Sequence, residues 1–434
     1  MSGLFLFKRG FQYMKKIFTI IMSFLLMMMG MLTPALAASQ SQIQPFVETT
    51  AADITAKSAI AVDQETGQIL YDKDSSTVQP IASMSKVISA YLIMKSVKEG
   101  KMTWNQKVSV NKSLEEVSEN KDLTNVPLDS SREYTVKELF DASLIYSANA
   151  AILALGKTEA GSSEKFVNKM RSTVEQWGIH DAKLYNAAGL LENQVGTEKY
   201  PQTADNVENE MSAKDMAIVV THVLKEFPEI LKVTSVQSAD FNTGTEKLEM
   251  INHNEMLKDG EQYDQKYQLD GLKTGTSEKA GENFAATGLI NKRRVISIVM
   301  GSKEDQRFKD TKKIWDPLMS RLVLKKTDLK NESNVKMNSA EDGKVGLRLS
   351  VPFDYWAKKD DSTKLTLNKI ELNDKKQIPF SAGEAVATGY LSLNDSNFLE
   401  GSKSGLKVAL ASTQSVKKAN ILVQVGRTIA DWFG

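Results

Sequence analysis

The sequence contains no cysteine and only three histidines among its 434 residues. Without cysteine, the chain has no disulfide bonds, no thiol nucleophile and no zinc site built on thiolates. His180, His222 and His253 form no His-x-x-x-His pair, so a histidine-based metal site is not expected either. A Ser-His-Asp triad has few candidates, and we interpret each histidine as a structural or surface residue, since no acid stands at a suitable spacing. We therefore predict neither a metal nor a cofactor.

Charge of one sign is also lacking, since 55 lysines and arginines face 54 acidic residues. No basic block points to nucleic acid, and no acidic tract points to disorder. The length exceeds that of one ordinary domain, so we expect two folded units with tails.

The N-terminal segment indicates export. Lysines and arginines at positions 8, 9, 15 and 16 precede an apolar run at 17–32, which ends near Ala35-Leu36-Ala37. This order is typical of a secretory signal peptide, here residues 1–37, and translation starting at Met14 would leave that signal complete. The alternative is an uncleaved membrane helix, but the run is shorter than the ~20 residues a span needs. We expect the mature protein at the outer face of the cytoplasmic membrane, in the bacterial cell envelope.

The pattern of apolar residues predicts an α+β fold. A flexible leader at 38–56 is followed by a β-hairpin in "SAIAVDQETGQILYDKD". We then expect helices at 81–97, 136–155 and 212–227, the second of them broken near Ser147, and strands at 284–289 and 295–300. These elements form the first predicted domain, residues 57–325, a sheet with helices packed on it.

The composition changes near Lys325, where "KKTDLKNESN" resembles a linker. Alternating apolar residues then predict a small all-β domain at 326–412. The last segment, 413–434, predicts an amphipathic helix that anchors the protein to a membrane surface. Its apolar residues fall in an arc of roughly 120°, and they are Ile421, Leu422, Val425, Ile429, Trp432 and Phe433. The alternative is a helix that packs on its own domain.

The stretch "IASMSKV" places two serines, Ser83 and Ser85, beside Lys86. Ser-x-x-Lys alone is weak evidence, but only this copy opens an apolar segment. On a helix, Lys86 lies about 60° from Ser83 but about 100° from Ser85, so it can reach only Ser83. A lysine buried in an apolar helix favours its neutral form and could act as a base beside a serine nucleophile. The alternative is a lysine that extends to solvent from an amphipathic helix.

Two further polar groups favour the catalytic interpretation. Ser147 and Asn149 interrupt an apolar helical run, where buried polar groups need partners. Lys273-Thr274-Gly275 is the only Lys-Thr-Gly in the chain and begins a predicted strand, where a glycine allows a ligand to approach the backbone.

Ser-x-x-Lys, Ser-x-Asn and Lys-Thr-Gly, in this order, are found in penicillin-binding proteins and class A β-lactamases. The chain resembles the low-molecular-mass penicillin-binding proteins of the D-alanyl-D-alanine carboxypeptidase group, also in "NAAGL" and "DGLKTGTSEKAGENFAATG". The resemblance implies a catalytic domain with an antiparallel sheet and helices on both faces, followed by the β domain and the terminal helix.

The resemblance also implies a role for each motif residue. Ser83 would be the acylated nucleophile, Lys86 its base, and Ser147 the group that relays a proton to the leaving D-alanine. Asn149 would hold a peptide amide, and Lys273 would support Ser147. Thr274 and Thr276 would bind the terminal carboxylate, with Gly275 in the same substrate-binding strand. Arg307 would assist with the carboxylate, and the alternative is an ordinary surface arginine. The backbone N–H groups of Ser83 and Thr276 would form the oxyanion hole.

The implied activity is removal of the terminal D-alanine from peptidoglycan stem peptides, with β-lactam antibiotics as covalent inhibitors. A transpeptidase or a β-lactamase of the same fold is the alternative. Thr276 stands where many carboxypeptidases have a bulkier residue, which leaves the balance between hydrolysis and transpeptidation open. A non-catalytic envelope scaffold would require three intact motifs to be accidental.

Overall fold

The computed structural model describes residues 54–327, 333–373, 378–399 and 405–433. The predicted signal peptide, 1–37, and most of the predicted leader, 38–56, lie outside these residues. The end of the leader is described, and Ile54 is buried there with an exposed fraction of 5%. The N–H and hydroxyl of Thr55 donate to Asp310 at 2.9 and 2.8 Å. Asp310 thus holds Thr55 and Ala56, at the end of the predicted leader, to the folded protein, and the leader as a whole stays a prediction.

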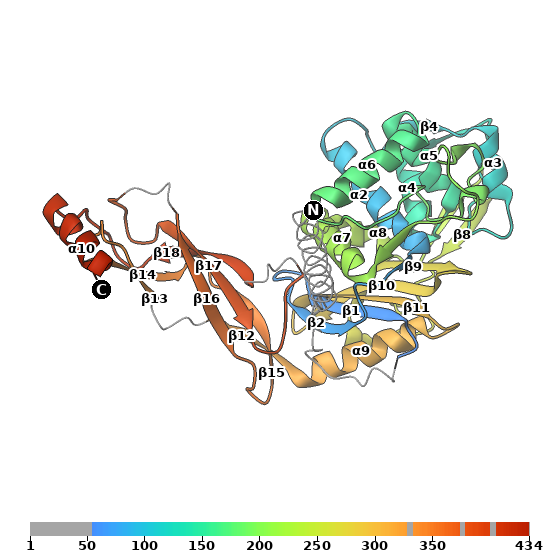
Figure 1. The fold of residues 1–434 in the computed structure, drawn as a ribbon. Helices are drawn as coiled ribbons and strands as arrows, with labels where there is room; N and C mark the ends of the chain where they lie inside the picture. Colours follow the sequence, from blue (N-terminus) through green and yellow to red (C-terminus); the bar gives the residue numbers. More distant parts are fainter. Residues whose placement is uncertain (1–53, 328–332, 374–377, 400–404, 434) are drawn as a thin grey trace, which may run out of the picture. The chain divides into compact units, whose positions relative to one another are not determined.

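Five strands form the central antiparallel sheet, in the order β2-β1-β11-β10-β9 (Figure 1). They are β1 (Ser58–Asp63), β2 (Ile69–Lys73), β9 (Leu269–Ser277), β10 (Gly281–Ile290) and β11 (Arg293–Ser302). β1 pairs with β11, from Ser58 opposite Met300 to Asp63 opposite Val295. The predicted hairpin and the two predicted late strands are confirmed, and the pairing joins them in one sheet.

Helices cover both faces of this sheet, and Figure 1 shows α9 on one face with α2 and α7 on the other. The helices of this region are α2 (Lys86–Lys98), α3 (Lys112–Glu119), α4 (Val136–Ile145), α5 (Asn149–Ala160), α6 (Ser163–Gln176), α7 (Ala213–Glu226), α8 (Leu231–Thr234) and α9 (Arg307–Arg321). Coverage on both faces explains why β11 is buried from Val295 to Ser302. The α+β prediction is confirmed, including the break between α4 and α5.

Three short ladders connect the loops around the helices. They pair β3 (Val78–Pro80) with β6 (Glu210–Ser212), β4 (Lys107–Ser109) with β5 (Glu133–Thr135), and β7 (Ser238–Asn242) with β8 (Lys247–Ile251). The first of them holds the chain just before the "IASMSKV" stretch, because Val78 pairs with Ser212 and Pro80 with Glu210.

A second antiparallel sheet follows in the C-terminal region, in the order β13-β14-β18-β17-β16. Its strands are β13 (Ser333–Lys336), β14 (Lys344–Leu349), β16 (Leu365–Leu372), β17 (Ala385–Leu393) and β18 (Leu406–Ser412). The all-β character predicted for this region is confirmed, and the apolar faces of these strands share a separate core. The division into domains at 325 and 326 stays a prediction.

The predicted linker is only partly described, and its described ends are not loose. β12 (Leu322–Lys326) includes the first two linker residues and pairs with β15 (Asp354–Lys358). The last linker residues, Ser333 and Asn334, begin β13. Both described ends of the predicted linker therefore take part in backbone pairing.

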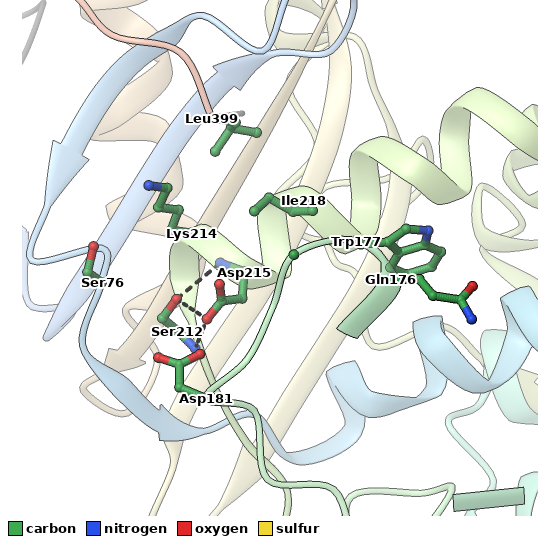
Figure 2. Close-up of a pocket in the computed structure, with 10 residues that line it drawn as sticks. Ser76, Gln176, Trp177, Asp181, Ser212, Lys214, Asp215, Ile218 and Leu399 are labelled. Atoms are coloured by element: carbon green, nitrogen blue, oxygen red, sulfur yellow. Dashed lines mark hydrogen bonds between the residues drawn. The ribbon is translucent and has the colours of Figure 1, made fainter. Parts of the chain in front are cut away.

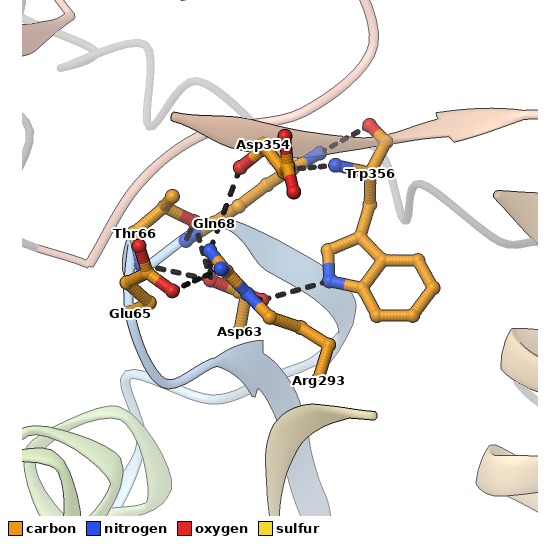
Figure 3. Close-up of polar contacts among 7 residues, drawn as sticks. All are labelled: Asp63, Glu65, Thr66, Gln68, Arg293, Asp354 and Trp356. Atoms are coloured by element: carbon orange, nitrogen blue, oxygen red, sulfur yellow. Dashed lines mark hydrogen bonds and ion pairs between the residues drawn. The ribbon is translucent and has the colours of Figure 1, made fainter. Parts of the chain in front are cut away.

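A buried polar cluster ties β15 to the central sheet (Figure 3). Trp356 donates its indole N–H to Asp63 at 2.8 Å, and Arg293 donates to the same carboxylate at 2.7 and 3.0 Å. The backbone N–H and C=O of Trp356 also bond the Gln68 side chain, at 2.8 and 2.9 Å. Asp63 is 1% exposed and therefore depends on these donors to remain buried.

The last helix, α10, spans Ile421–Phe433. Arg427 donates from it to the carbonyls of Ala340 and Glu341 at 2.7 and 2.9 Å, which attaches the helix to the loop between β13 and β14. Several of its apolar side chains face solvent, including Leu422 at 78% and Ile429 at 53% exposed. None of the helices within the described ranges has the length and apolar character that crossing a bilayer requires.

Candidate active site

Ser83 lies on a 3₁₀ turn (Ala82–Ser85) directly before α2. The α-helix begins at Lys86, slightly later than predicted, but the three-residue spacing still brings the two side chains together because residues i and i+3 eclipse on a 3₁₀ turn. Lys86 Nζ lies 2.8 Å from Ser83 Oγ. Ser83 is partly exposed, whereas the Lys86 side chain has no exposed surface. The accessible hydroxyl of Ser83 therefore contacts the buried amine of Lys86.

Ser85 lies on another side of the same turn. Its hydroxyl donates to the Ala82 carbonyl at 2.7 Å and accepts from Asn209 Nδ2 at 2.9 Å. The residue is fully buried. These bonds connect the turn to the segment before β6, so Ser85 contributes to structure while Ser83 meets the lysine.

Two neutral acceptors surround the Lys86 amine besides Ser83. Nζ donates to Asn149 Oδ1 at 2.7 Å and to the Ala188 carbonyl at 3.2 Å. Burial, and next the charge of Lys273, hold the pKa of Lys86 well below its usual value. A neutral amine has two N–H donors and one lone pair. Because the two acceptors take the donors, the lone pair is free to accept the proton of Ser83.

The "NAAGL" stretch packs against both the turn of Ser83 and the Lys86 amine. Gly189 has φ +78°, and a Cβ on it would lie 2.0 Å from the Ala82 carbonyl oxygen. Glycine is therefore required for the close approach of this loop to the turn Ala82–Ser85, which carries the predicted nucleophile and is called the nucleophile turn below. Asn186 Oδ1 accepts from the N–H groups of Ala188 and Gly189 at 3.1 and 2.7 Å, which orients the carbonyl that contacts Lys86.

Ser147 and Asn149 lie where α4 ends and α5 begins. Ser147 has φ +64°, a left-handed conformation that costs energy for a residue other than glycine and is often found at functional sites. It is 5% exposed. Asn149 uses its oxygen on Lys86 and its Nδ2 on the Thr124 carbonyl, at 2.9 Å. Its predicted role of holding a peptide amide stays a prediction, since both ends of the side chain are engaged within the protein.

Lys273 is the second buried amine of the site, with an exposed fraction of 3%. Burial, and next the charge of Arg307, lower its pKa to about 7. Its Nζ donates to the Thr274 carbonyl at 3.0 Å. Within the described residues, no hydrogen bond joins Lys273 to Ser147, so the predicted support of Ser147 by Lys273 stays a prediction.

The Lys-Thr-Gly strand, β9, lies against the nucleophile turn. A Cβ on Gly275 would be 2.8 Å from the Ile81 carbonyl oxygen and 3.2 Å from the Ser83 nitrogen. The sequence suggested that this glycine makes room for a ligand, but the backbone that it admits is that of the nucleophile turn. Thr274 beside it is buried, whereas Thr276 is exposed.

Arg307, at the start of α9, is brought to the same end of β9. Its Nη1 donates to Thr276 Oγ1 at 3.0 Å, and its Nη2 donates to Glu282 at 2.8 Å. The structure therefore gathers the predicted residues along two walls, the helical wall of Ser83, Lys86 and Asn149, and the edge of β9.

Sequence reasoning missed His253. Although part of its side chain is exposed, desolvation and then the charge of Lys273 lower the pKa of His253 to about 4, so the imidazole is neutral. Its ring lies 5.7 Å from that of Tyr146, the residue before Ser147. The spacing of "INHN" gives no signal for this placement, because His253 lies on a loop about a hundred residues beyond Ser147 in the sequence.

A separate cavity of about 630 Å³ contains none of the predicted site residues (Figure 2). Trp177, Lys214 and Asp215 are among the residues that line it. Burial, and also the nearby charge of Asp181, raise the pKa of Asp215. The motifs and this cavity therefore mark different places on the molecule.

A partly exposed serine, a buried amine with a lowered pKa and a partly exposed arginine beside a strand edge are the groups that a serine acyl-transfer enzyme needs. A family model described as D-alanyl-D-alanine carboxypeptidase matches residues 45–304. The D-alanyl-D-alanine carboxypeptidase DacF of Bacillus subtilis is 26% identical over 383 residues, covering 87% of this chain and 90% of that protein.

Solved structures of related proteins are also similar to this chain. A peptidoglycan synthesis regulatory factor (PBP3) from Streptococcus pneumoniae is 29% identical with a TM-score of 0.68, covering 83% of this chain and 99% of that one. A penicillin-binding protein from Listeria monocytogenes, in its ampicillin-bound form, is 27% identical with a TM-score of 0.50, covering 61% of this chain and 97% of that one. The chain belongs to the D-alanyl-D-alanine carboxypeptidase family of serine peptidases, which confirms the resemblance, the fold and the enzyme class expected from the sequence.

Proposed function

We propose that the chain removes the terminal D-alanine of peptidoglycan stem peptides through an acyl-enzyme on Ser83. The observation that carries this proposal is the 2.8 Å contact between Ser83 Oγ and the fully buried amine of Lys86. A serine hydroxyl is a weak nucleophile alone, and an adjacent base of suitable pKa activates it.

In the acylation step, neutral Lys86 takes the proton of Ser83 while Oγ attacks the carbonyl carbon of the penultimate D-alanine. The backbone N–H groups of Ser83 and Thr276 stabilise the developing oxyanion. The C–N bond then breaks, and the D-alanine amine leaves with the proton that Lys86 returns through Ser147. When substrate binds, Asn149 gives up one of its internal hydrogen bonds, so that its N–H or its oxygen can bond to the peptide.

In the deacylation step, Lys86 takes a proton from water as the water oxygen attacks the ester carbonyl, and it then returns that proton to Ser83. A class A β-lactamase instead uses a glutamate to activate this water. Glu192 is fully buried and accepts from Asn186 Nδ2 at 2.9 Å and from the Tyr200 N–H at 2.6 Å. Both oxygens of Glu192 are engaged within the protein, and the proposal assigns the base of both steps to Lys86.

The edge of β9 recognises the substrate carboxylate in this proposal. Thr274 and Thr276 offer hydroxyl groups, Gly275 keeps the strand close to Ser83, and Arg307 offers its guanidinium. Lys273 adds a positive field, and its pKa of about 7 leaves it partly charged at neutral pH.

The proposal is tested by measuring D-alanine release from a Lys-D-Ala-D-Ala peptide, with and without penicillin. We expect release by the wild type and its loss after preincubation with penicillin. Absence of release, or release that penicillin does not reduce, would contradict the proposed function. A deacylation half-life of seconds or less after penicillin would favour a β-lactamase.

We also propose that residues 1–37 direct export and that α10 holds the enzyme on the outer face of the membrane. Exposed Ile421 and Leu422, at 67% and 78%, support an interfacial helix, while Arg427 keeps it attached to the β domain. The test is sedimentation of the full chain with vesicles that contain anionic lipid. Leu422→Asp should reduce the bound fraction severalfold without changing peptide hydrolysis, and unchanged binding would contradict the anchor.

A further inference from the structure

Glu282, a residue outside the three motifs, lies directly across the sheet from Thr276. β10 pairs Glu282 with Thr276 of β9 on one side and with Ser302 of β11 on the other. The register between β10 and β11 shifts between Glu282 and Phe284. Irregularities of this kind redirect a side chain and are frequent beside active sites.

The carboxylate of Glu282 holds both the backbone and the side chain of Arg307. Oε1 accepts from Arg307 Nη2 at 2.8 Å, and Oε2 accepts from the backbone N–H groups of Gln306 and Arg307 at 3.3 Å each. Gln306, which precedes α9, makes no side-chain capping bond of its own. A carboxylate from β10 therefore occupies the N-terminus of α9, where a negative charge is stabilised.

The other end of the guanidinium points to the proposed substrate site. Arg307 Nη1 donates to Thr276 Oγ1 at 3.0 Å, so the planar group bridges two residues that face each other across the strands. The side chains of Arg307 and Glu282 are 16% and 11% exposed. Burial opposes ionisation of Glu282, but the hydrogen bond and charge of Arg307 outweigh it and hold the pKa of Glu282 below its usual value. Glu282 is therefore ionised at neutral pH.

We propose that Glu282 is a positioning residue that holds Arg307 against Thr276 and so prepares the guanidinium for the carboxylate of the substrate. A long side chain that is already fixed loses less conformational entropy on binding than one that is free. Glu282 bonds Nη2 of the guanidinium, whereas Nη1 beside Thr276 has a second N–H that a ligand can use. This inference rests on the proposed role of Arg307 in carboxylate binding.

The same sheet contains an ion pair that serves as a matched control. Arg294 donates to both oxygens of Asp270, at 2.7 Å each, so both terminal nitrogens of its guanidinium bond to one carboxylate. The side chains of Arg294 and Asp270 are 21% and 32% exposed. Loss of either ion pair affects the stability of the sheet, but only Glu282 is expected to affect substrate binding.

The first experiment compares KM and kcat for D-alanine release by Glu282→Ala and Asp270→Ala. Because Glu282 acts on binding, Glu282→Ala should raise KM about 10-fold, the loss expected when one charge-assisted contact is no longer preorganised, with kcat within about twofold. Asp270→Ala should change neither constant more than about twofold. Glu282→Gln, which keeps an oxygen acceptor without the charge, should raise KM less than the alanine variant. Equal effects of Glu282→Ala and Asp270→Ala on KM would overturn the inference.

The second experiment is a double-mutant cycle with Arg307→Ala. If Glu282 acts through Arg307, adding Glu282→Ala to Arg307→Ala should change KM less than twofold. A full 10-fold effect in that background would overturn the inference and leave the role of Arg307 intact. No change of KM in Arg307→Ala itself would instead refute the assignment of Arg307, and the positioning role with it.

Discussion

The two walls of the site hold their cationic side chains in opposite ways. On the helical wall, Lys86 is completely buried, and its hydrogen-bond partners among the described residues are the neutral groups Ser83, Asn149 and the Ala188 carbonyl. At the edge of β9, Arg307 is partly exposed and meets the carboxylate of Glu282. Burial without a counter-ion favours the neutral form, whereas pairing with a carboxylate preserves the charge. In the proposed mechanism, this difference separates proton transfer from carboxylate binding.

Lys273 lies between these extremes. It is buried like Lys86 but lies within reach of the charge of Arg307, and its pKa is lowered to about 7. The charge of Lys273 in turn lowers the pKa of Lys86. The charges at the edge of β9 therefore influence the pKa of Lys86 on the helical wall.

The largest effect is expected from breaking the helical wall with Lys86→Met. This change keeps the volume but removes the base, so kcat/KM for D-alanine release should fall by roughly 10² to 10⁴-fold. The exposed Lys98 lies on the same helix, and Lys98→Met provides the matched control with activity close to wild type. Activity of Lys86→Met within tenfold of wild type would show that another group is the base.

A smaller effect is expected from breaking the binding edge with Arg307→Ala. Loss of one charge-assisted hydrogen bond should raise KM roughly 10- to 100-fold with little change in kcat. The measurement compares a peptide that ends in D-alanine with one that ends in D-alaninamide. Wild type should prefer the carboxylate and the variant should not; a preference that survives would assign carboxylate binding to other residues.

A shift in pH dependence is expected when the link between the walls is removed with Lys273→Met. Lys86 acts as a base only when neutral, so activity rises with pH through its pKa. Since the charge of Lys273 lowers that pKa, its loss raises it and moves the acidic limb of kcat/KM to higher pH. The pH profile of Lys279→Met, an exposed lysine after β9, is the control. An acidic limb that stays in place or moves to lower pH would contradict the coupling.

The smallest effect is expected from Ser85→Ala, on the structural side of the nucleophile turn. The variant loses the bonds to Ala82 and Asn209, which should cost about 1 to 2 kcal/mol of unfolding free energy. Thermal denaturation should therefore shift down by a few degrees, while kcat/KM stays within about threefold of wild type. A loss of activity comparable to that of Lys86→Met would mean that the wrong serine has been chosen.

Much of this organisation is readable from local patterns. The break between α4 and α5, the strand of residues 295–300 and the pairing of Ser83 with Lys86 follow from periodicity and from contacts three residues apart. These features depend on neighbours in sequence, and for that reason a single chain without relatives predicts them.

The rest depends on which strands meet and in what register. Glu282 reaches Arg307 through a shift in the pairing of β10 with β11, and His253 approaches Lys273 from a loop. Gly275 admits the nucleophile turn rather than a ligand, and Asp310 binds a segment that composition suggested was loose. Contacts between residues tens to hundreds of positions apart leave no periodic signal in the sequence.

The central claim is that Ser83, and not Ser85, becomes acylated. The most direct measurement is the intact mass of the protein after reaction with benzylpenicillin, for wild type, Ser83→Ala and Ser85→Ala. We predict that wild type and Ser85→Ala each gain the mass of one penicillin and that Ser83→Ala gains none. Undiminished acylation of Ser83→Ala would contradict the account.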